Sequence, residues 1–245
     1  LVLQDDLKYK MGMKKILITG ASRGIGLELA RQLLKEGNTV YGTYRNKNSS
    51  KNLFQLAENE NKLQLVCLDV NSSESIKSAI RTIEANSPSL DQVFNNAGIL
   101  DWNSLKQISV DSFKEIYETN VIGAFQVSQG ALPLLQKGKD PLIINLSSRL
   151  GSIGLRGETQ LGGAIAYQCS KAALNMLTKQ SSIDYLEYGV RVISISPGWV
   201  KTDMGGLEAK YEVPESVKLI LSLLENLPTH STGIFIGEDG ETIPW

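Results

Sequence analysis

The chain has little of what metal sites, disulfides and membrane spans require. It contains two cysteines, Cys67 and Cys169, and a single histidine, His230. One cysteine lies in an apolar run and the other in a helical stretch, so we expect no structural disulfide. No Cys/His cluster has metal-ligand spacing, so we expect no metal. No apolar run approaches the ~18 residues that a transmembrane helix needs, so we expect a cytoplasmic protein without a membrane partner.

The chain also lacks an excess of charge of either sign. It has 25 Lys and Arg against 26 Asp and Glu, a formal net charge of -1. Such a balance gives no overall electrostatic field that would attract nucleic acid, so small molecules are the expected partners. A chain of 245 residues with 42% hydrophobic content can bury one sizeable core. Residues 1–12 precede Met13 and are mostly polar, so we expect an N-terminal extension or cloning remnant there and a single domain over 13–245.

Short apolar runs rich in β-formers alternate with helical patterns from residue 14 onward. Such alternation predicts an α/β fold with a parallel sheet covered by helices on both faces. We expect one Rossmann-type, doubly wound domain with seven parallel strands, and a long helix over residues 111–136. The strands are predicted at residues 15–19, 39–44, 64–68, 92–95, 142–147, 191–196 and 234–236.

A glycine-rich turn follows the first predicted strand. Gly20, Gly24 and Gly26 lie between an apolar run and an amphipathic helical pattern. Glycines let the backbone turn tightly and approach a pyrophosphate, which the N-terminus of a helix favours. The alternative is a turn that needs glycine for steric reasons alone. The strand before the turn and the helix after it favour nucleotide binding.

Tyr167 and Lys171 lie four residues apart in a stretch that is predicted to be helical, so both project from one face. A phenol has a reference pKa of about 10, and a neighbouring ammonium favours its ionised form. We therefore predict that Lys171 lowers the pKa of Tyr167 and that the pair serves as acid-base machinery. Taken singly, each could instead be an ordinary core tyrosine or solvated lysine.

Five motifs follow one another along the chain: Thr19-Gly-x-x-x-Gly-x-Gly26, Asn95-Asn-Ala-Gly98, Ile144 to Gly151 with its paired serines, Tyr167-x-x-x-Lys171, and Pro197-Gly198 followed by Thr202. Together they resemble the short-chain dehydrogenase/reductase family, over essentially all of residues 14–245. Within that family, the run Gly-Trp-Val-Lys-Thr-Asp-Met-Gly-Gly and the final Ile-Pro-Trp are similar to the C-factor and sniffer-type carbonyl reductases. Residues 151–163 form a glycine-rich insertion.

The resemblance implies four catalytic residues: Asn120, Ser148, Tyr167 and Lys171. Tyr167 would protonate a carbonyl oxygen as NADPH delivers hydride to the carbon, and Ser148 would hydrogen-bond the same oxygen. Lys171 would also hold the nicotinamide ribose, and Asn120 would hold a water that links Lys171 to solvent. The alternative for Asn120 is that it satisfies nearby backbone groups. Ser148 is preferred to Ser147 because the family pattern Ser-x-x-Gly begins there.

The cofactor implied by the resemblance is NADP(H). An acidic residue at the end of the second strand would bind the 2′-hydroxyl of NAD, but Arg45 stands there, and Arg23 lies in the glycine turn. Both can pair with a 2′-phosphate, unless they are only surface cations. Asp69 would contact adenine, or else cap a turn. The other implied contacts are Gly20, Ser22, Gly24, Ile25, Gly26, Val70, Asn96, Ala97, Gly98, Tyr167, Lys171, Pro197, Gly198, Val200 and Thr202.

The expected activity is the NADPH-dependent reduction of an aldehyde, ketone or quinone to an alcohol. Residues 204–214 would cover the substrate, with Gly205 and Gly206 allowing movement, and an open pocket would give broad carbonyl tolerance. Two alternatives stay open: a nucleotide-binding signalling module of C-factor type that needs no turnover, and an NAD-linked alcohol dehydrogenase. Family members usually pair through the helices around Asn120 and Tyr167, which implies a homodimer or homotetramer.

Overall fold

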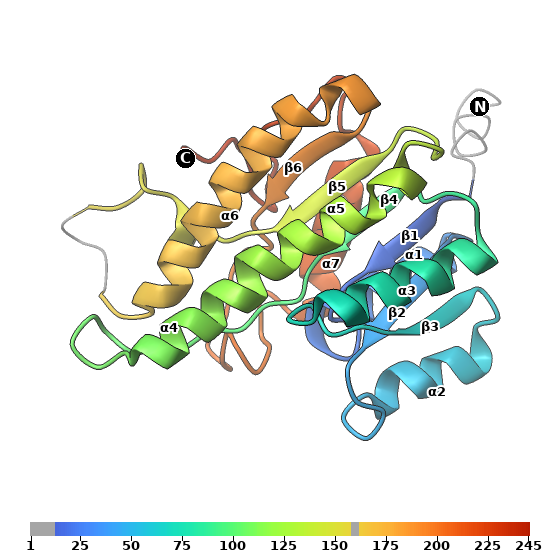
Figure 1. Ribbon diagram of the computed structural model, residues 1–245. Coiled ribbons are helices and arrows are strands. Elements are labelled where there is room, and N and C mark those ends of the chain that lie inside the picture. The colour runs from blue at the N-terminus through green and yellow to red at the C-terminus, as the bar shows by residue number, and fades with distance from the viewer. Residues whose placement is uncertain (1–12, 158–161) are drawn as a thin grey trace, which may run out of the picture.

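The computed structural model describes residues 13–157 and 162–245. The predicted extension over residues 1–12, and residues 158–161 of the predicted insertion, lie outside this part of the chain. Seven parallel strands form one sheet in the order β3-β2-β1-β4-β5-β6-β7 (Figure 1). This confirms the predicted Rossmann-type α/β fold. The strands are β1 (Lys15–Ile18), β2 (Thr39–Tyr44), β3 (Leu63–Cys67), β4 (Gln92–Asn95), β5 (Leu142–Leu146), β6 (Arg191–Ile195) and β7 (Phe235–Ile236).

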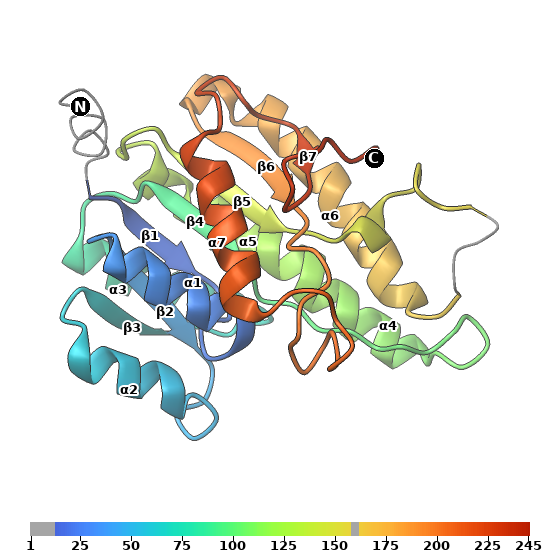
Figure 2. The same cartoon turned by 180° about the vertical axis from the view of Figure 1, so that it is seen from behind.

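Helices cover both faces of the sheet. The helices α1, α2 and α7 lie on the face that Figure 2 shows in front, and α3, α4, α5 and α6 lie on the face in front in Figure 1. Two short 3-10 helices, η2 (Arg149–Gly151) and η3 (Leu186–Tyr188), flank α6. The α-helices are α1 (Gly24–Lys35), α2 (Lys51–Asn59), α3 (Ser73–Asn86), α4 (Val110–Tyr117), α5 (Gly123–Leu135), α6 (Ile165–Asp184) and α7 (Val213–Glu225).

The strands β1 to β6 contribute buried side chains to two hydrophobic cores, one on each face of the sheet. In β1, Ile16 and Ile18 join the core beneath α1 and α7, while Leu17 between them joins the core beneath α3 and α5. All three side chains are fully buried. Burying such a side chain contributes roughly 1.5–3 kcal/mol. A sheet buried on both faces explains why its strands are continuous apolar runs rather than alternating ones.

The strand order reverses beside β1, which pairs with β2 on one side and β4 on the other. In open α/β sheets, ligands bind beyond the carboxyl ends of the strands at such a switch point. The turn after β1 and the segment after β4 therefore meet at the expected binding crevice.

The helix predicted over residues 111–136 is interrupted. Between α4 and α5 lies a π-helix, η1 (Glu118–Ile122), with Asn120 at its centre. π-Bulges inside helices are frequent at functional sites, and sequence periodicity alone did not reveal this one. Among residues 13–157 and 162–245, no helix combines the length and the apolar character needed to cross a membrane.

Candidate functional site

The glycines after β1 are required by backbone geometry. Gly20 and Gly24 have φ values of 65° and 54°, in the left-handed region that favours glycine. A Cβ added at Gly26 would overlap the carbonyl oxygen of Gly20 and lie 2.5 Å from the side-chain nitrogen of Asn96. The side chain of Arg23, the N-cap residue of α1, makes no capping hydrogen bond with the first amides of the helix. The first amides of α1 are therefore available to an anion.

Thr19 and Asn96 hold this turn against the segment after β4. The Thr19 hydroxyl donates to the carbonyl of Phe94 at 3.2 Å and accepts from the amides of Asn96 and Ala97 at 3.0 Å each. The Asn96 side chain donates to the carbonyls of Thr19 and Gly20 at 2.9 and 3.0 Å. The side chain of Asn96 thus fixes the turn. Sequence analysis included Thr19 in the glycine motif but gave it no role in the site, although its position at the end of the strand was a usable signal.

The polar side chains of the turn form hydrogen bonds with other side chains of the same protein chain. The hydroxyls of Ser22 and Ser50 share a hydrogen bond of 2.9 Å. Arg23 Nη1 donates to Asp203 Oδ2 at 2.7 Å, from side chains that are 76% and 80% exposed. Arg45 is exposed directly after β2, and no ion pair of the described chain involves it.

The residues after β3 and β4 line the same end of the sheet. Asp69 Oδ1 accepts from the Asn71 amide at 3.0 Å, so Asp69 closes a turn as the alternative interpretation expects. Val70 is buried. A Cβ added at Gly98 would lie 3.2 Å from Asn120 Oδ1 and 3.7 Å from Lys171 Nζ. Bare backbone at Gly98 therefore leaves space beside the predicted catalytic lysine.

Helix α6 carries Tyr167 and Lys171, which are 8% and 5% exposed. Lys171 Nζ donates to the carbonyl of Leu146 at 2.7 Å and lies 5.5 Å from the centre of the Tyr167 ring. Burial lowers the pKa of Lys171 to about 8. Burial has the opposite effect on the phenol: it raises the pKa of Tyr167 to about 12, and a hydrogen bond with Ser148 opposes this rise.

The pKa of Tyr167 in the chain itself is therefore raised, not lowered as predicted. Removing the phenol from water disfavours its ionised form, and this desolvation sets the direction of the shift. Tyr167 is consequently protonated throughout the physiological pH range, and Lys171 is the group of the pair that titrates near pH 8.

The two serines after β5 have different environments. Ser147 is 2% exposed and donates to Asn175 Oδ1 at 2.6 Å. Ser148 is half-buried, and its hydroxyl oxygen accepts from the Leu150 amide at 3.1 Å. The proton of Ser147 is thus used inside the protein, while the hydrogen bond with Leu150 leaves the proton of Ser148 for another acceptor. This difference supports the choice of Ser148.

The side chain of Asn120 is held entirely by protein groups. Its Oδ1 accepts from the Ile99 amide at 2.8 Å, and its Nδ2 donates to the Ile99 carbonyl and the Ser170 hydroxyl at 2.9 and 3.0 Å. Asn120 therefore joins the segment after β4 to α6, as the structural alternative expects. Its role in holding a water stays a prediction.

The loop between β6 and α7 begins at the predicted carboxamide site. The Pro197 carbonyl accepts from the Ser216 hydroxyl at 2.7 Å. Gly198 has a φ of 79°, and a Cβ there would lie 2.8 Å from the Tyr211 ring. Val200 forms an isolated bridge with Tyr211. These contacts hold the two ends of the loop together. Thr202 packs near the glycine turn, since its Cγ2 would lie 3.5 Å from a Cβ added at Gly24.

The predicted mobility of Gly205 does not agree with its surroundings. Its amide donates to the Thr202 hydroxyl at 3.1 Å, and its carbonyl accepts from the Trp199 indole at 2.8 Å. A Cβ added at Gly205 would overlap the carbonyl of Val200. Close packing, rather than freedom to move, requires glycine there. Gly206, with a φ of 77° and open space around it, is glycine for its backbone conformation.

A family model described as short chain dehydrogenase matches residues 14–212. The chain belongs to the short-chain dehydrogenase family. An NADPH-bound carbonyl reductase from chicken fatty liver is 36% identical, with a TM-score of 0.91 over 96% of this chain and 100% of its own. The carbonyl reductase Sniffer of D. melanogaster is 33% identical, with a TM-score of 0.90 over the same shares. The C-signal of Myxococcus xanthus is 34% identical over 64% of this chain and 93% of its own length.

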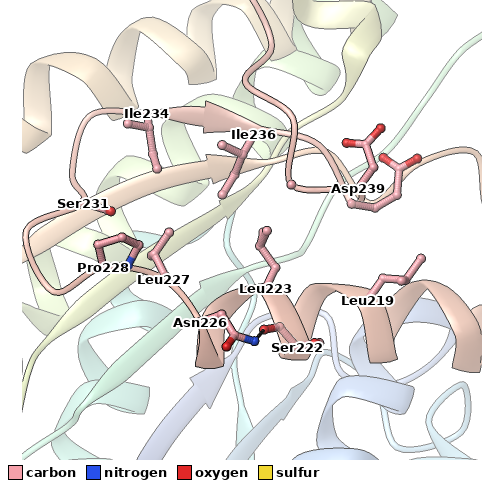
Figure 3. A pocket seen from close by; sticks show the side chains of 12 residues that line it. Leu219, Ser222, Leu223, Asn226, Leu227, Pro228, Ser231, Ile234, Ile236 and Asp239 are labelled. Atoms are coloured by element: carbon pink, nitrogen blue, oxygen red, sulfur yellow. Dashed lines mark hydrogen bonds between the residues drawn. The ribbon is translucent and has the colours of Figure 1, made fainter.

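A groove lies elsewhere on this dehydrogenase-family chain, between α7 and β7 (Figure 3). It has a volume of about 490 Å³, and apolar side chains such as Leu223 and Ile236 line it beside Asp239. None of the predicted site residues lines this groove. Within residues 13–157 and 162–245, no cluster of three or more His, Cys, Asp or Glu side chains could hold a metal ion.

Proposed function

We propose that the chain is an NADPH-dependent carbonyl reductase that converts an aldehyde, ketone or quinone to the alcohol. One observation carries this proposal: a buried, protonated phenol at Tyr167 has the hydroxyl of Ser148 and the amine of Lys171 beside it, at the carboxyl end of β5. The similar proteins from chicken and D. melanogaster are both carbonyl reductases, which supports the same substrate class here.

The residues of the chain fit a nicotinamide dinucleotide. The positive φ at Gly20 and Gly24 and the uncapped start of α1 form a cradle for a pyrophosphate. Bare backbone at Gly98 leaves room beside Lys171, which would hold the ribose. The turn at Pro197 and Gly198 would hold the carboxamide. When bound, NADPH supplies the hydride.

The chain itself supplies the proton and stabilises the developing charge. The Tyr167 hydroxyl would donate its proton to the carbonyl oxygen, and general acid catalysis of this kind contributes about 10²–10⁴-fold. The Ser148 hydroxyl would donate a hydrogen bond to the same oxygen as negative charge develops there. The Lys171 ammonium would stabilise the phenolate that remains after proton transfer.

The charge of Lys171 predicts an alkaline limit to reduction. Because burial lowers its pKa to about 8, the ammonium is the major form below that pH and is lost above it. We expect kcat to be level from about pH 6 to 7 and to fall roughly tenfold per unit above about pH 8.5. Steady-state rates across this range check the expectation. In Lys171→Met, the fall of kcat at alkaline pH should disappear. A flat profile up to about pH 10 would contradict the role of the ammonium.

Arg45 is expected to favour NADPH over NADH. Its exposed guanidinium can pair with a 2′-phosphate, and Arg45→Asp replaces that attraction by repulsion. We expect the Kd for NADPH to rise at least about tenfold, with little change in the Kd for NADH. Calorimetric titration measures both constants, and Lys47→Asp, at an exposed position two residues away, is the matched control. Tighter binding of NADH than of NADPH by the unmodified protein would favour the NAD-linked alternative.

The substrate class is tested by following NADPH consumption across a panel of quinones, ketones, aldehydes and pterins. We expect several classes to react at comparable rates, because residues 204–214, which would cover the substrate, are a short segment for a lid. A single substrate that reacts orders of magnitude faster than all others would contradict broad tolerance. No consumption with any member would contradict the proposed activity.

The similarity to C-signal favours a second candidate function, a nucleotide-binding signalling module that needs no turnover. Tyr167→Phe separates the two in the native organism. A signalling module would keep its cellular effect in this variant, whereas a reductase would lose it together with activity.

Assembly and location stay predictions. The exposed apolar side chains of Phe125 on α5 and Met176 on α6, 41% and 69% exposed, support the pairing of copies through these helices. Mass measurement by light scattering would distinguish a monomer from the expected homodimer or homotetramer.

A further inference from the structure

One exposed ion pair joins the glycine turn to the loop between β6 and α7. Arg23 and Asp203 are 180 positions apart in the sequence, and their charged groups meet at 2.7 Å. Arg23 is the N-cap residue of α1, and Asp203 follows Thr202 in the loop that is predicted to hold the carboxamide. The pair therefore joins two segments that would both hold the cofactor.

The helix end explains why Asp203 is attracted to this position. The N-terminus of a helix carries partial positive charge, so a guanidinium there is unfavourable and a carboxylate is favourable. The first turn of α1 contains no acidic residue of its own. Among the described residues, Asp203 is the only ion-pair partner of Arg23. The negative charge at this end of α1 thus comes from the loop.

We propose that Asp203 is a specificity-determining residue that competes with the 2′-phosphate of NADPH for Arg23. This inference rests on the proposed function. A phosphate that pairs with Arg23 has to displace the Asp203 carboxylate or accept repulsion from it. NADH has no 2′-phosphate and leaves the ion pair intact. Asp203 therefore weakens NADPH binding selectively, and opposes the preference that Arg23 and Arg45 create.

The test compares cofactor binding by the unmodified protein and by Asp203→Asn, which keeps the size of the side chain and removes its charge. Calorimetric titration at low salt should show NADPH binding about two- to fivefold tighter in the variant, the range given by one exposed ion pair. The Kd for NADH should stay unchanged. The gain for NADPH should shrink at high salt, because exposed charges are screened.

Two further variants make the result specific. Glu208→Gln removes one negative charge from an exposed position of the same loop and should leave both constants unchanged. In an Arg23→Gln background, Asp203→Asn should no longer tighten NADPH binding. The proposal of competition is wrong if Asp203→Asn leaves NADPH binding unchanged or weaker, or tightens the binding of NADPH and NADH equally. Failure of the unmodified protein to bind NADPH at all would instead overturn the proposed function.

Discussion

Replacing Tyr167 by phenylalanine is expected to lower kcat for carbonyl reduction by about 10³-fold and to leave the Kd for NADPH within about threefold. The ring is 8% exposed, and phenylalanine keeps its packing while removing the proton donor. Ser148 and Lys171 remain in place, so the loss reports the hydroxyl alone. Steady-state rates with the best carbonyl substrate and a calorimetric titration with NADPH measure the two quantities.

Tyr188→Phe is the matched control for this variant. It removes a phenol hydroxyl from η3, which follows α6, at a side chain that is 40% exposed. Its kcat and Tm should equal those of the unmodified protein. If Tyr167→Phe instead keeps more than about a tenth of kcat, general acid catalysis by this residue is excluded, because its smallest usual contribution is about 10²-fold.

Replacing Gly26 by alanine is expected to lower the free energy of unfolding by about 3 kcal/mol and to weaken NADPH binding at least tenfold. The added Cβ would overlap the backbone oxygen of Gly20, which cannot rotate away as a flexible side chain could. It would also push on Asn96, whose side chain holds the turn. The turn and the first amides of α1 must therefore shift.

Thermal unfolding checks the stability effect, with an expected fall in Tm of about 6–12 °C for a domain of this size. Gly130→Ala in α5 is the control, since a Cβ there would meet its nearest neighbours at an ordinary 3.4 and 3.5 Å. Its Tm should stay the same or rise, because alanine favours a helix. An unchanged Tm in Gly26→Ala would show that the turn tolerates a side chain.

The fold could be predicted because local patterns and global topology agree. The apolar run around Leu17 is buried on both sides, which is the signature of a central parallel strand. The π-helix around Asn120 could not be predicted, because the contacts that Asn120 makes there, with Ile99 and Ser170, join segments that are distant in the sequence. Periodicity across residues 111–136 is compatible with an uninterrupted helix as well.

The site was predictable where sequence spacing fixes geometry and less so where distant segments meet. The separation of Tyr167 and Lys171 by one helical turn follows from the sequence. The direction of the pKa shift of Tyr167 does not, because desolvation depends on the surrounding tertiary structure. The ion pair of Arg23 and Asp203 joins residues 180 positions apart, so local sequence patterns cannot predict it. The packing of Gly205 against the Val200 carbonyl could not be predicted either, because it depends on the conformation of the loop that holds both residues.

The central claim is that hydride passes from NADPH to a carbonyl carbon while Tyr167 protonates the oxygen. The most direct measurement uses NADPH deuterated at the transferable position, with the product analysed by mass spectrometry and NMR. The account predicts one deuterium on the carbinol carbon for each NADPH consumed, in the unmodified protein and at a much lower rate in Tyr167→Phe. Consumption of NADPH without deuterium on that carbon, or equal rates in the two proteins, would contradict it.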